Sequence, residues 1–294
     1  MKKLLFPAII VSSLVFAVYY LHEKSLLNLN SIVWGKDIYF SLIFLFAGFL
    51  ASTLSWWYAL KVHNINISVK SAITSHGLSV FAKYIPGKIW TVLGRASKIS
   101  IETDVSVGVT SFISLKEQLV YLLTGIFVSI IPVYLTYGFS LFFVFVLLSG
   151  VGLALIIFNK IIHKLLIKIL NKFLKKEIEL PLLSIKEGLK LSLFNFILWF
   201  FWAGAFYFFG KSFDTEFTFS LAFVFPVSVV YGVLAIILPG GIGVREGIIS
   251  AYLSMSGLNL ELATTISVVS RLWFFFGEVF IFLTSVLVNL FKTK

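Results

Sequence analysis

The sequence contains no cysteine. This absence excludes disulfide bonds, thiolate metal sites and a cysteine nucleophile, although it identifies no compartment. Histidine is also scarce, and His22, His63, His76 and His163 are too scattered to predict a metal site. The sequence has no HExxH, GxSxG or Walker motif. We therefore expect no metal, no cofactor and no catalytic residues in this chain.

Charged residues make up only 13% of the chain, whereas 59% of its residues are hydrophobic and 33 positions are phenylalanine. A soluble domain of this size does not need so much apolar side chain. A membrane-spanning helix needs about 20 mainly apolar residues to cross a hydrocarbon core of about 30 Å. The composition therefore predicts an all-α polytopic membrane protein, with residues 1–294 forming a single transmembrane domain.

Acidic residues are few, with 13 Asp and Glu against 24 Lys and Arg, which gives a formal net charge of +11. Such an excess could suggest nucleic-acid binding, but the basic residues lie in loops between apolar segments. Anionic lipid headgroups and the positive-inside rule account for that distribution. We therefore expect membrane lipids, and no nucleic acid, as partners.

Seven apolar segments are long enough to span a membrane. The predicted spans are 4–21, 38–60, 113–135, 139–158, 190–210, 217–238 and 266–290. The first apolar run is long and lacks a small-x-small cleavage site, so we interpret it as a retained helix and not as a signal peptide.

Two further segments, 69–98 and 239–257, are interrupted and do not span cleanly. The interruptions are Pro86 and Gly87 in the first segment and Pro239, Gly240, Gly241 and Gly243 in the second. Irregular backbone is tolerated at membrane depth only where protein or a water-filled cavity satisfies it. We therefore predict two re-entrant segments. Paired Gly/Pro interruptions also suggest an internal repeat and indicate where a transporter binds its substrate.

Lysine and arginine are concentrated in loops 61–106 and 159–189, whereas the opposite loops carry only Lys24, Lys36 and Lys211. The positive-inside rule then places the N-terminus and both Pro-Gly segments on the cytoplasmic side of the inner membrane. Lysines at 292 and 294 do not fit, because seven spans would put them outside. Either a short tail escapes the rule, or one interrupted segment crosses the membrane.

Segment 160–176 is amphipathic, with lysines four residues apart and Leu and Ile between them. Two interpretations stay open. The segment is either a helix lying on the inner leaflet or a solvated turn between spans.

Basic residues accompany both interruptions. Lys88 and Arg95 follow the first Pro-Gly pair, and Arg245 follows the second. Free N–H groups at helix N-termini attract anions, and the arginine fork suits phosphate. We expect Lys88, Arg95, Arg245 and Arg271 to bind a lipid phosphate. The alternative for Lys88, and for Lys83 before it, is an ordinary positive-inside anchor.

Ionisable residues also occur within predicted spans, where they usually face a bundle interior or a cavity. Arg271 and Glu278 share one face of the last span with Thr264 and Ser285, because all four are spaced by seven residues. We expect Glu117, Glu246 and Glu278 to gate the path or to carry protons.

A structural ion pair is the alternative interpretation, with Arg271 or Arg245 bound to Glu117 or Glu278. We take Glu117 as the candidate partner of Arg271, because both lie near cytoplasmic helix ends in the predicted topology. The polar face formed by Asn195, Trp199 and Trp202 is expected to serve packing.

The motifs YIPGKIWTVLGR and LPGGIGVREG, together with Arg271, resemble the transmembrane region of lysylphosphatidylglycerol synthases. This flippase-like family includes stand-alone proteins of similar length, and the resemblance covers nearly the whole chain. It implies a lipid-translocating domain, whereas a separate soluble domain of the two-part synthases aminoacylates phosphatidylglycerol. We expect no room here for that catalytic domain. Trp90, Gln118 and Tyr121 depart from the family pattern, so the headgroup is left open.

Three functions follow as hypotheses. The first is a flippase for a phospholipid, or for a polyprenyl-phosphate-linked precursor, with an anionic phosphate headgroup. The second is the membrane subunit of an aminoacyl or glycosyl transferase whose chemistry lies on a separate partner. The third is a transporter of small solutes or ions.

Overall fold

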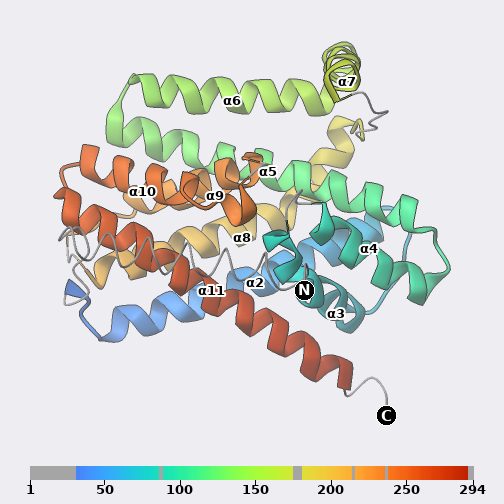
Figure 1. Ribbon diagram of the computed structural model, residues 1–294, viewed down its shortest axis with the longest axis horizontal. Coiled ribbons are helices and arrows are strands. Elements are labelled where there is room, and N and C mark those ends of the chain that lie inside the picture. Colours follow the sequence, from blue (N-terminus) through green and yellow to red (C-terminus); the bar gives the residue numbers. More distant parts are fainter. Residues whose placement is uncertain (1–30, 86–88, 175–180, 214–215, 236–237, 291–294) are drawn as a thin grey trace.

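The computed structural model describes residues 31–85, 89–174, 181–213, 216–235 and 238–290 (Figure 1). Three sequence predictions lie outside these ranges: the first span at 4–21, the Pro86–Lys88 interruption and the C-terminal lysines. Within the described ranges every regular element is helical.

Five of the described helices are long and apolar enough to cross a membrane. They are α2 (Lys36–Val62), α5 (Val107–Tyr137), α6 (Leu141–Phe158), α8 (Ile185–Lys211) and α11 (Leu260–Leu290). Each overlaps a predicted span, and even the 18-residue α6 reaches about 27 Å at about 1.5 Å per residue. The helices follow the long axis of Figure 1, so the fold is that of a multi-pass membrane protein.

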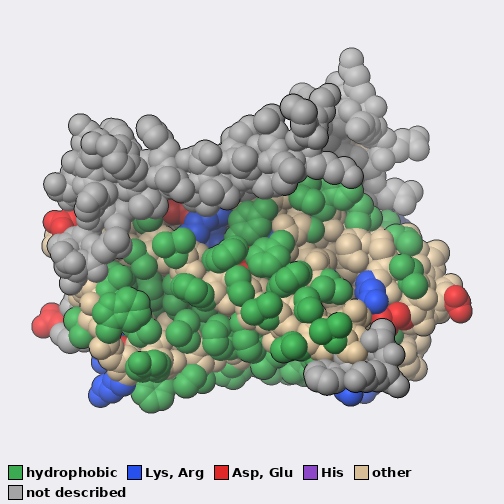
Figure 2. Space-filling view, turned by 60° about the horizontal axis from the view of Figure 1, so that its bottom comes forward, with side chains coloured by type: hydrophobic (Ala, Val, Ile, Leu, Met, Phe, Trp, Pro, Cys, Tyr) green, Lys and Arg blue, Asp and Glu red, His purple; other side chains and the backbone are tan. Residues whose placement is uncertain are grey.

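The outer surface of this bundle is apolar. Leu141 and Leu148 of α6 are 91% and 62% exposed, and Phe276 of α11 is 61% exposed. Figure 2 shows a broad hydrophobic face, with charged side chains gathered mostly toward its two ends. Such a surface is costly in water and suits the hydrocarbon core of a bilayer.

Helix α2 lies at the centre and packs along α8, and it also contacts α3, α5 and α11. The close approach to α8 depends on Gly48, because a Cβ there would lie 2.2 Å from the ring of Trp202. Small residues at helix crossings are how membrane bundles bring backbones together.

The first interrupted segment forms a helical hairpin, here called hairpin 1. It consists of α3 (Val69–Ser79), the 3₁₀ turn η2 (Val80–Tyr84) and α4 (Trp90–Thr103), with α3 packed against α4. The Ser68 side chain caps α3 by accepting from the amide of Ser71. Ser285 of α11 donates to the carbonyl of Ile73, which docks hairpin 1 against the C-terminal half of α11.

The second interruption forms hairpin 2. It consists of η3 (Leu221–Phe223), α9 (Val224–Leu234), η4 (Pro239–Gly241) and α10 (Val244–Met255), with α9 packed against α10. Its tip needs glycine, because Gly240, Gly241 and Gly243 have φ values of 60°, 69° and 84°. A Cβ on Gly241 would also lie 2.7 Å from the backbone of Gly232.

The predicted span at 217–238 is therefore shorter than expected. Its helical part, Leu221–Leu234, is short of the ~20 residues that a crossing needs. The chain leaves the helix at Ala235 and turns toward α10. The apolar composition misled the prediction because most residues of α9 are buried against protein, and a helix hydrophobic on all sides is typical of a core.

Hairpin 1 begins at the end of the bundle where α2 finishes and α5 and α8 begin. His63, Lys116 and Glu187 from those three helices meet there. We call it the basic end, because its helix ends and connections carry Lys61, Lys70, Lys98, Lys160 and Lys186.

Hairpin 2 begins at the opposite end, where Tyr137 at the end of α5 donates to the carbonyl of Tyr252 in α10. The prediction that residues 239–247 are reached from the same side as 85–97 stays a prediction, although the two hairpins begin at opposite ends of the bundle. Since hairpin 2 returns to the end it came from, α11 runs back to the basic end, where it packs against α3. The C-terminal lysines themselves lie outside the described residues.

The tips of the two hairpins meet in the middle of the molecule. Element η2 contacts η4, and a Cβ on Gly240 would lie 2.9 Å from the ring of Tyr84. Both tips face the centre of the 31-residue α11. The described parts of the two hairpin tips thus converge on one place, as expected for segments that build a site.

The amphipathic segment is helical, as α7 (Lys160–Leu174), and follows α6 at the basic end (Figure 1). Its Ile161 and Leu165 are 78% and 56% exposed. Placement on a leaflet stays a prediction, because nothing in the fold fixes the bilayer surface.

Candidate functional site

A cavity of about 170 Å³ lies where the two hairpin tips meet. Side chains from both hairpins and from α2, α5, α8 and α11 line it. The charged residues in its wall are Lys83, Arg95, Glu117 and Arg245, and the polar ones include Ser52, His76, Tyr84, Thr91, Gln118, Tyr121 and Trp202. The remaining lining is largely apolar, so any charge inside is poorly solvated.

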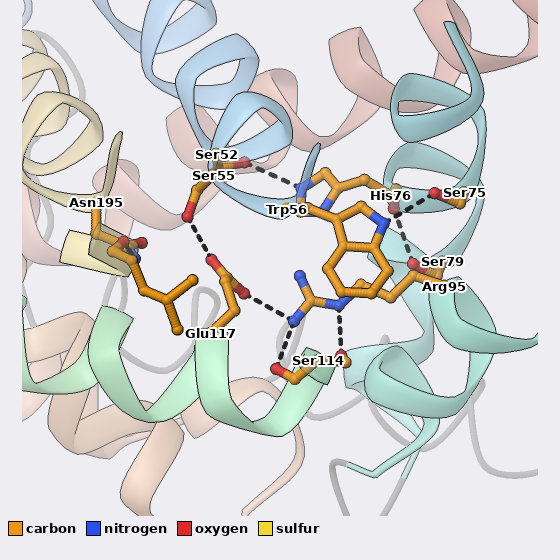
Figure 3. A network of polar contacts seen from close by, with 11 residues as sticks. Ser52, Ser55, Trp56, Ser75, His76, Ser79, Arg95, Ser114, Glu117 and Asn195 are labelled. Carbon is orange, nitrogen blue, oxygen red and sulfur yellow. Dashed lines mark hydrogen bonds and ion pairs between the residues drawn. The ribbon is translucent and has the colours of Figure 1, made fainter. Parts of the chain in front are cut away.

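Arg95 of hairpin 1 is bound to α5 by three hydrogen bonds, from its Nε and Nη2 atoms (Figure 3). Its Nη2 lies 2.8 Å from Glu117 Oε2 and 2.8 Å from the Ser114 carbonyl oxygen, and its Nε donates to Ser114 Oγ at 2.6 Å. The guanidinium also lies 4.4 Å from the ring centroid of Trp56. The second carboxylate oxygen of Glu117 accepts from Ser55 at 2.7 Å. Both charges are buried and compensated.

The predicted pairing of Glu117 with Arg271 is therefore wrong. Glu117 binds Arg95, whereas Arg271 binds Glu246. The prediction failed because it placed Arg271 near a cytoplasmic helix end, and Arg271 instead lies near the middle of α11.

Glu278 joins hairpin 1 to α11. Its two oxygens accept from Lys83 Nζ at 2.5 Å and from the Tyr84 hydroxyl at 2.9 Å. Glu278 is 1% exposed, whereas the Lys83 side chain is 29% exposed and lines the cavity, so the carboxylate is buried and its cationic partner is not. The tip of hairpin 1 is thus attached to α11 by a charged and a neutral contact.

Arg271 makes the equivalent attachment for hairpin 2. Its Nη1 lies 2.7 Å from Glu246 Oε1, and its Nη2 donates to the carbonyl oxygen of Gly240 at 3.1 Å. The other oxygen of Glu246 accepts from the amide of Gly243 at 2.7 Å, at the start of α10. Arg271 and Glu278 are two helical turns apart, so the points at which α11 holds the two touching tips lie about 10.5 Å apart along its axis.

Arg245 differs from these charges because it has no carboxylate partner among the described residues. It is 8% exposed, its Nε has no hydrogen-bond partner, and its guanidinium lies 5.4 Å and 4.9 Å from the ring centroids of Phe225 and Phe274. Cation–π contacts and the more distant carboxylates of Glu246 and Glu278 offset part of the desolvation cost, but a buried charge without a directly bound counterion stays expensive. An anion in the cavity would compensate it.

Three other cavity residues have buried polar atoms without a hydrogen-bond partner in the described part of the chain. They are His76 Nδ1, Thr91 Oγ1 and Trp202 Nε1. Unsatisfied buried polar atoms are uncommon in native proteins. In the described part of the chain these atoms gather around one cavity, together with Arg245.

The predicted site residues are only partly gathered around the cavity. Arg95, Glu117, Arg245 and Gly240 line it, whereas Arg271, Glu246 and Glu278 lie behind the hairpin tips and hold them. Lys88, Pro86 and Gly87 fall outside the described residues. Pro239, Gly241 and Gly243 belong to the tip of hairpin 2 and the turn that follows it, as predicted.

The sequence analysis undervalued Lys83, His76 and Trp202. The sequence gives Lys83 an alternative role as a positive-inside anchor, excludes His76 only from a metal site, and assigns Trp202 to packing. The available signal was spacing, because His76, Val80 and Lys83 follow one another at i, i+4 and i+7 on one helical face. Among the described residues no cluster of His, Asp and Glu could hold a metal ion.

Comparison with known families gives one match. The family model described as the lysylphosphatidylglycerol synthase TM region matches residues 5–281. No curated protein and no solved structure matches the chain. The match spans both hairpins, all the long helices up to the middle of α11, and every residue of the cavity. The chain therefore belongs to the family of lysylphosphatidylglycerol synthase transmembrane regions.

Proposed function

We propose that the protein is a flippase that moves a phospholipid, or a lipid-linked precursor with an anionic phosphate headgroup, across the cytoplasmic membrane. The observation that carries the proposal is Arg245, a buried guanidinium without a carboxylate partner in the wall of a central cavity. A phosphate is the natural complement, because the planar guanidinium can donate two parallel hydrogen bonds to it.

The depth of the cavity supports movement across the bilayer. The hairpin tips contact α11 at Arg271 and Glu278, which flank the midpoint of this 31-residue helix. A headgroup bound there would be halfway along the bundle. Substrate sites near the midplane, built by interrupted helices, are characteristic of secondary transporters.

The opposed hairpins supply a mechanism for alternating access. Hairpin 1 begins at the basic end and hairpin 2 at the opposite end, and each is attached to α11 by its own ion pair. Release of the Lys83–Glu278 contact would free the tip of hairpin 1 alone. Release of the Arg271–Glu246 contact would free the tip of hairpin 2. In this proposal Glu278 and Glu246 act as gate residues, while Arg95 and Glu117 form a fixed wall.

Orientation follows from the distribution of lysine. The basic end faces the cytoplasm in this proposal, since cytoplasmic loops carry the excess of Lys and Arg. Hairpin 1 is then re-entrant from the cytoplasm and hairpin 2 from outside.

Reconstitution tests the proposal. Purified protein in phosphatidylcholine vesicles with a trace of tail-labelled anionic phospholipid should make the inner-leaflet label accessible to a membrane-impermeant quencher. Arg245→Gln should slow this movement about tenfold or more, since a hydrogen-bonded charge pair contributes ~1.5–3 kcal/mol. Lys190→Gln is the matched control, because Lys190 is an exposed cation on α8 away from the cavity. Equal rates in the wild type and in protein-free vesicles would contradict the proposal.

A further inference from the structure

The cavity also constrains the headgroup. We infer that the substrate is a lipid whose small headgroup combines one phosphodiester with hydroxyl groups and carries no ammonium group. This inference rests on the proposed function, because it names the class of lipid that the same cavity would take.

The first observation is a hydrogen-bond acceptor in the cavity wall. The Ser52 hydroxyl donates to the carbonyl of Phe49 at 3.0 Å, and Ser52 Oγ also lies 3.0 Å from His76 Nε2. Since the serine proton is used, the neutral imidazole donates through Nε2–H, which leaves Nδ1 with a lone pair. His76 Nδ1 has no donor among the described residues. A ligand hydroxyl would supply one.

The second observation is that the other unsatisfied atoms are donors or can serve as either. Trp202 Nε1 and Arg245 Nε are donors only, and Thr91 Oγ1 can donate or accept. A phosphodiester offers acceptors alone, so it satisfies Arg245 and Trp202 but not His76. A phosphodiester that carries hydroxyl groups satisfies all of them.

The third observation is charge, and it excludes an ammonium group as the donor to His76. Among the described cavity residues Glu117 alone carries a carboxylate, and both of its oxygens are already engaged by Arg95 and Ser55. The wall also presents Arg245, a cation without a carboxylate partner among the described residues, whereas Lys83 and Arg95 are paired with Glu278 and Glu117. In an apolar wall, where like charges repel strongly, a positively charged headgroup would find no counterion.

The fourth observation is size. The volume of about 170 Å³ is close to that of an engineered protein cavity of ~150 Å³ that holds benzene. A phosphoglycerol-sized headgroup is of this order, whereas an oligosaccharide is much larger. The cavity therefore favours a short polyol over a lipid-linked glycan.

Three labelled lipids separate these contributions in the vesicle assay. Phosphatidylglycerol carries a phosphodiester with hydroxyls, phosphatidylmethanol carries the phosphodiester alone, and lysylphosphatidylglycerol adds ammonium groups. The wild type should move phosphatidylglycerol about fivefold faster than phosphatidylmethanol, as expected for one net hydrogen bond. It should move lysylphosphatidylglycerol more slowly than phosphatidylglycerol.

Conservative variants of cavity residues test whether the cavity wall causes the preference for phosphatidylglycerol over phosphatidylmethanol. Thr91→Val and His76→Leu should each bring the ratio of the phosphatidylglycerol rate to the phosphatidylmethanol rate close to one. The ratio of two lipids within one preparation corrects for any loss of folded protein. Thr284→Val is the matched control, because the Thr284 hydroxyl donates to Phe280 in α11 and Thr284 does not line the cavity.

The outcomes distinguish failure of this inference from failure of the proposed flippase function. Equal rates for phosphatidylglycerol and phosphatidylmethanol in the wild type would overturn the inference and leave the flippase intact. Faster movement of lysylphosphatidylglycerol than of phosphatidylglycerol would also overturn the inference and leave the flippase intact. Movement of none of the three lipids would overturn both.

Discussion

Two arginines in one cavity wall illustrate two uses of a buried charge. Arg95 is enclosed by Glu117, Ser114 and Trp56, so its charge is fully compensated by the protein. Arg245 lies between two aromatic rings and has no carboxylate partner in the described chain. The first arrangement holds α4 against α5, and the second is costly unless a ligand completes it.

Removal of the unpaired charge should therefore separate stability from function. Arg245→Met should leave the melting temperature in detergent unchanged or raise it, because a desolvated cation is replaced by an apolar chain of similar length. Lipid movement should fall about tenfold or more. Thermal unfolding and vesicle assays on the same preparation check this, and a variant that is both unstable and inactive would point to a structural role.

The paired arginine should respond in the opposite way. Arg95→Gln and Glu117→Gln should each destabilise the protein by ~3–5 kcal/mol, because each leaves a buried charge without its partner. The double variant should recover part of that loss. A thermal double-mutant cycle measures the coupling, and the pair Glu117→Gln with Arg271→Gln serves as its control. Simple additivity of the Arg95 and Glu117 effects would contradict the observed contact.

At this scale the sequence located the charges but not their partners. Proximity to a Pro-Gly interruption singled out Arg95 and Arg245, and a seven-residue spacing singled out Arg271 and Glu278. Which carboxylate meets which cation depends on how the hairpins dock on α5 and α11, and spacing along one helix carries no information about that. Lys83 could not be separated from an inside-positive anchor for the same reason.

At the scale of elements, glycines fix the tip of hairpin 2. Gly241 has a φ of 69°, and a Cβ added to it would lie 2.7 Å from the backbone of Gly232. The interruption itself was predictable, because Pro and Gly mark it in the sequence. The reversal of the chain was not, since α9 has the composition of a spanning helix but is buried by its neighbours.

Gly241→Ala should consequently destabilise the protein by about 1–3 kcal/mol, through the left-handed backbone and the contact with Gly232. Gly247→Ala is the control, because it lies inside α10 with nothing within 4 Å of an added Cβ. There alanine should be neutral or stabilising by up to about 1 kcal/mol. Thermal unfolding of both variants provides the comparison. Equal effects of the two alanines would mean that the tip is not constrained as described.

At the scale of the whole molecule, the hairpins enter from opposite ends and meet at the centre. For the C-terminal lysines the sequence offered two explanations, a short tail that escapes the positive-inside rule or an interrupted segment that crosses the membrane. Neither explanation includes hairpin 2, in which α9 packs against α10 and Tyr137 at the end of α5 contacts both Tyr252 and Ser256. Counting apolar segments could not reveal this reversal of the chain.

Cysteine accessibility tests this topology cleanly, because the natural sequence has no cysteine. Met255→Cys, at a position 67% exposed at the end of α10, should react with an impermeant thiol reagent in intact cells. Lys190→Cys, near the basic end, should react only after the cells are opened. Labelling of both positions from the same side would contradict the opposed hairpins.

The central claim is that the cavity binds the phosphate of a lipid through Arg245. Native mass spectrometry of the purified protein, with identification of the lipid released from it, tests this most directly. We predict an anionic phospholipid bound to the wild type and to Lys190→Gln, and its loss from Arg245→Gln at unchanged melting temperature. Retention of the same lipid at the same occupancy by Arg245→Gln would contradict the claim.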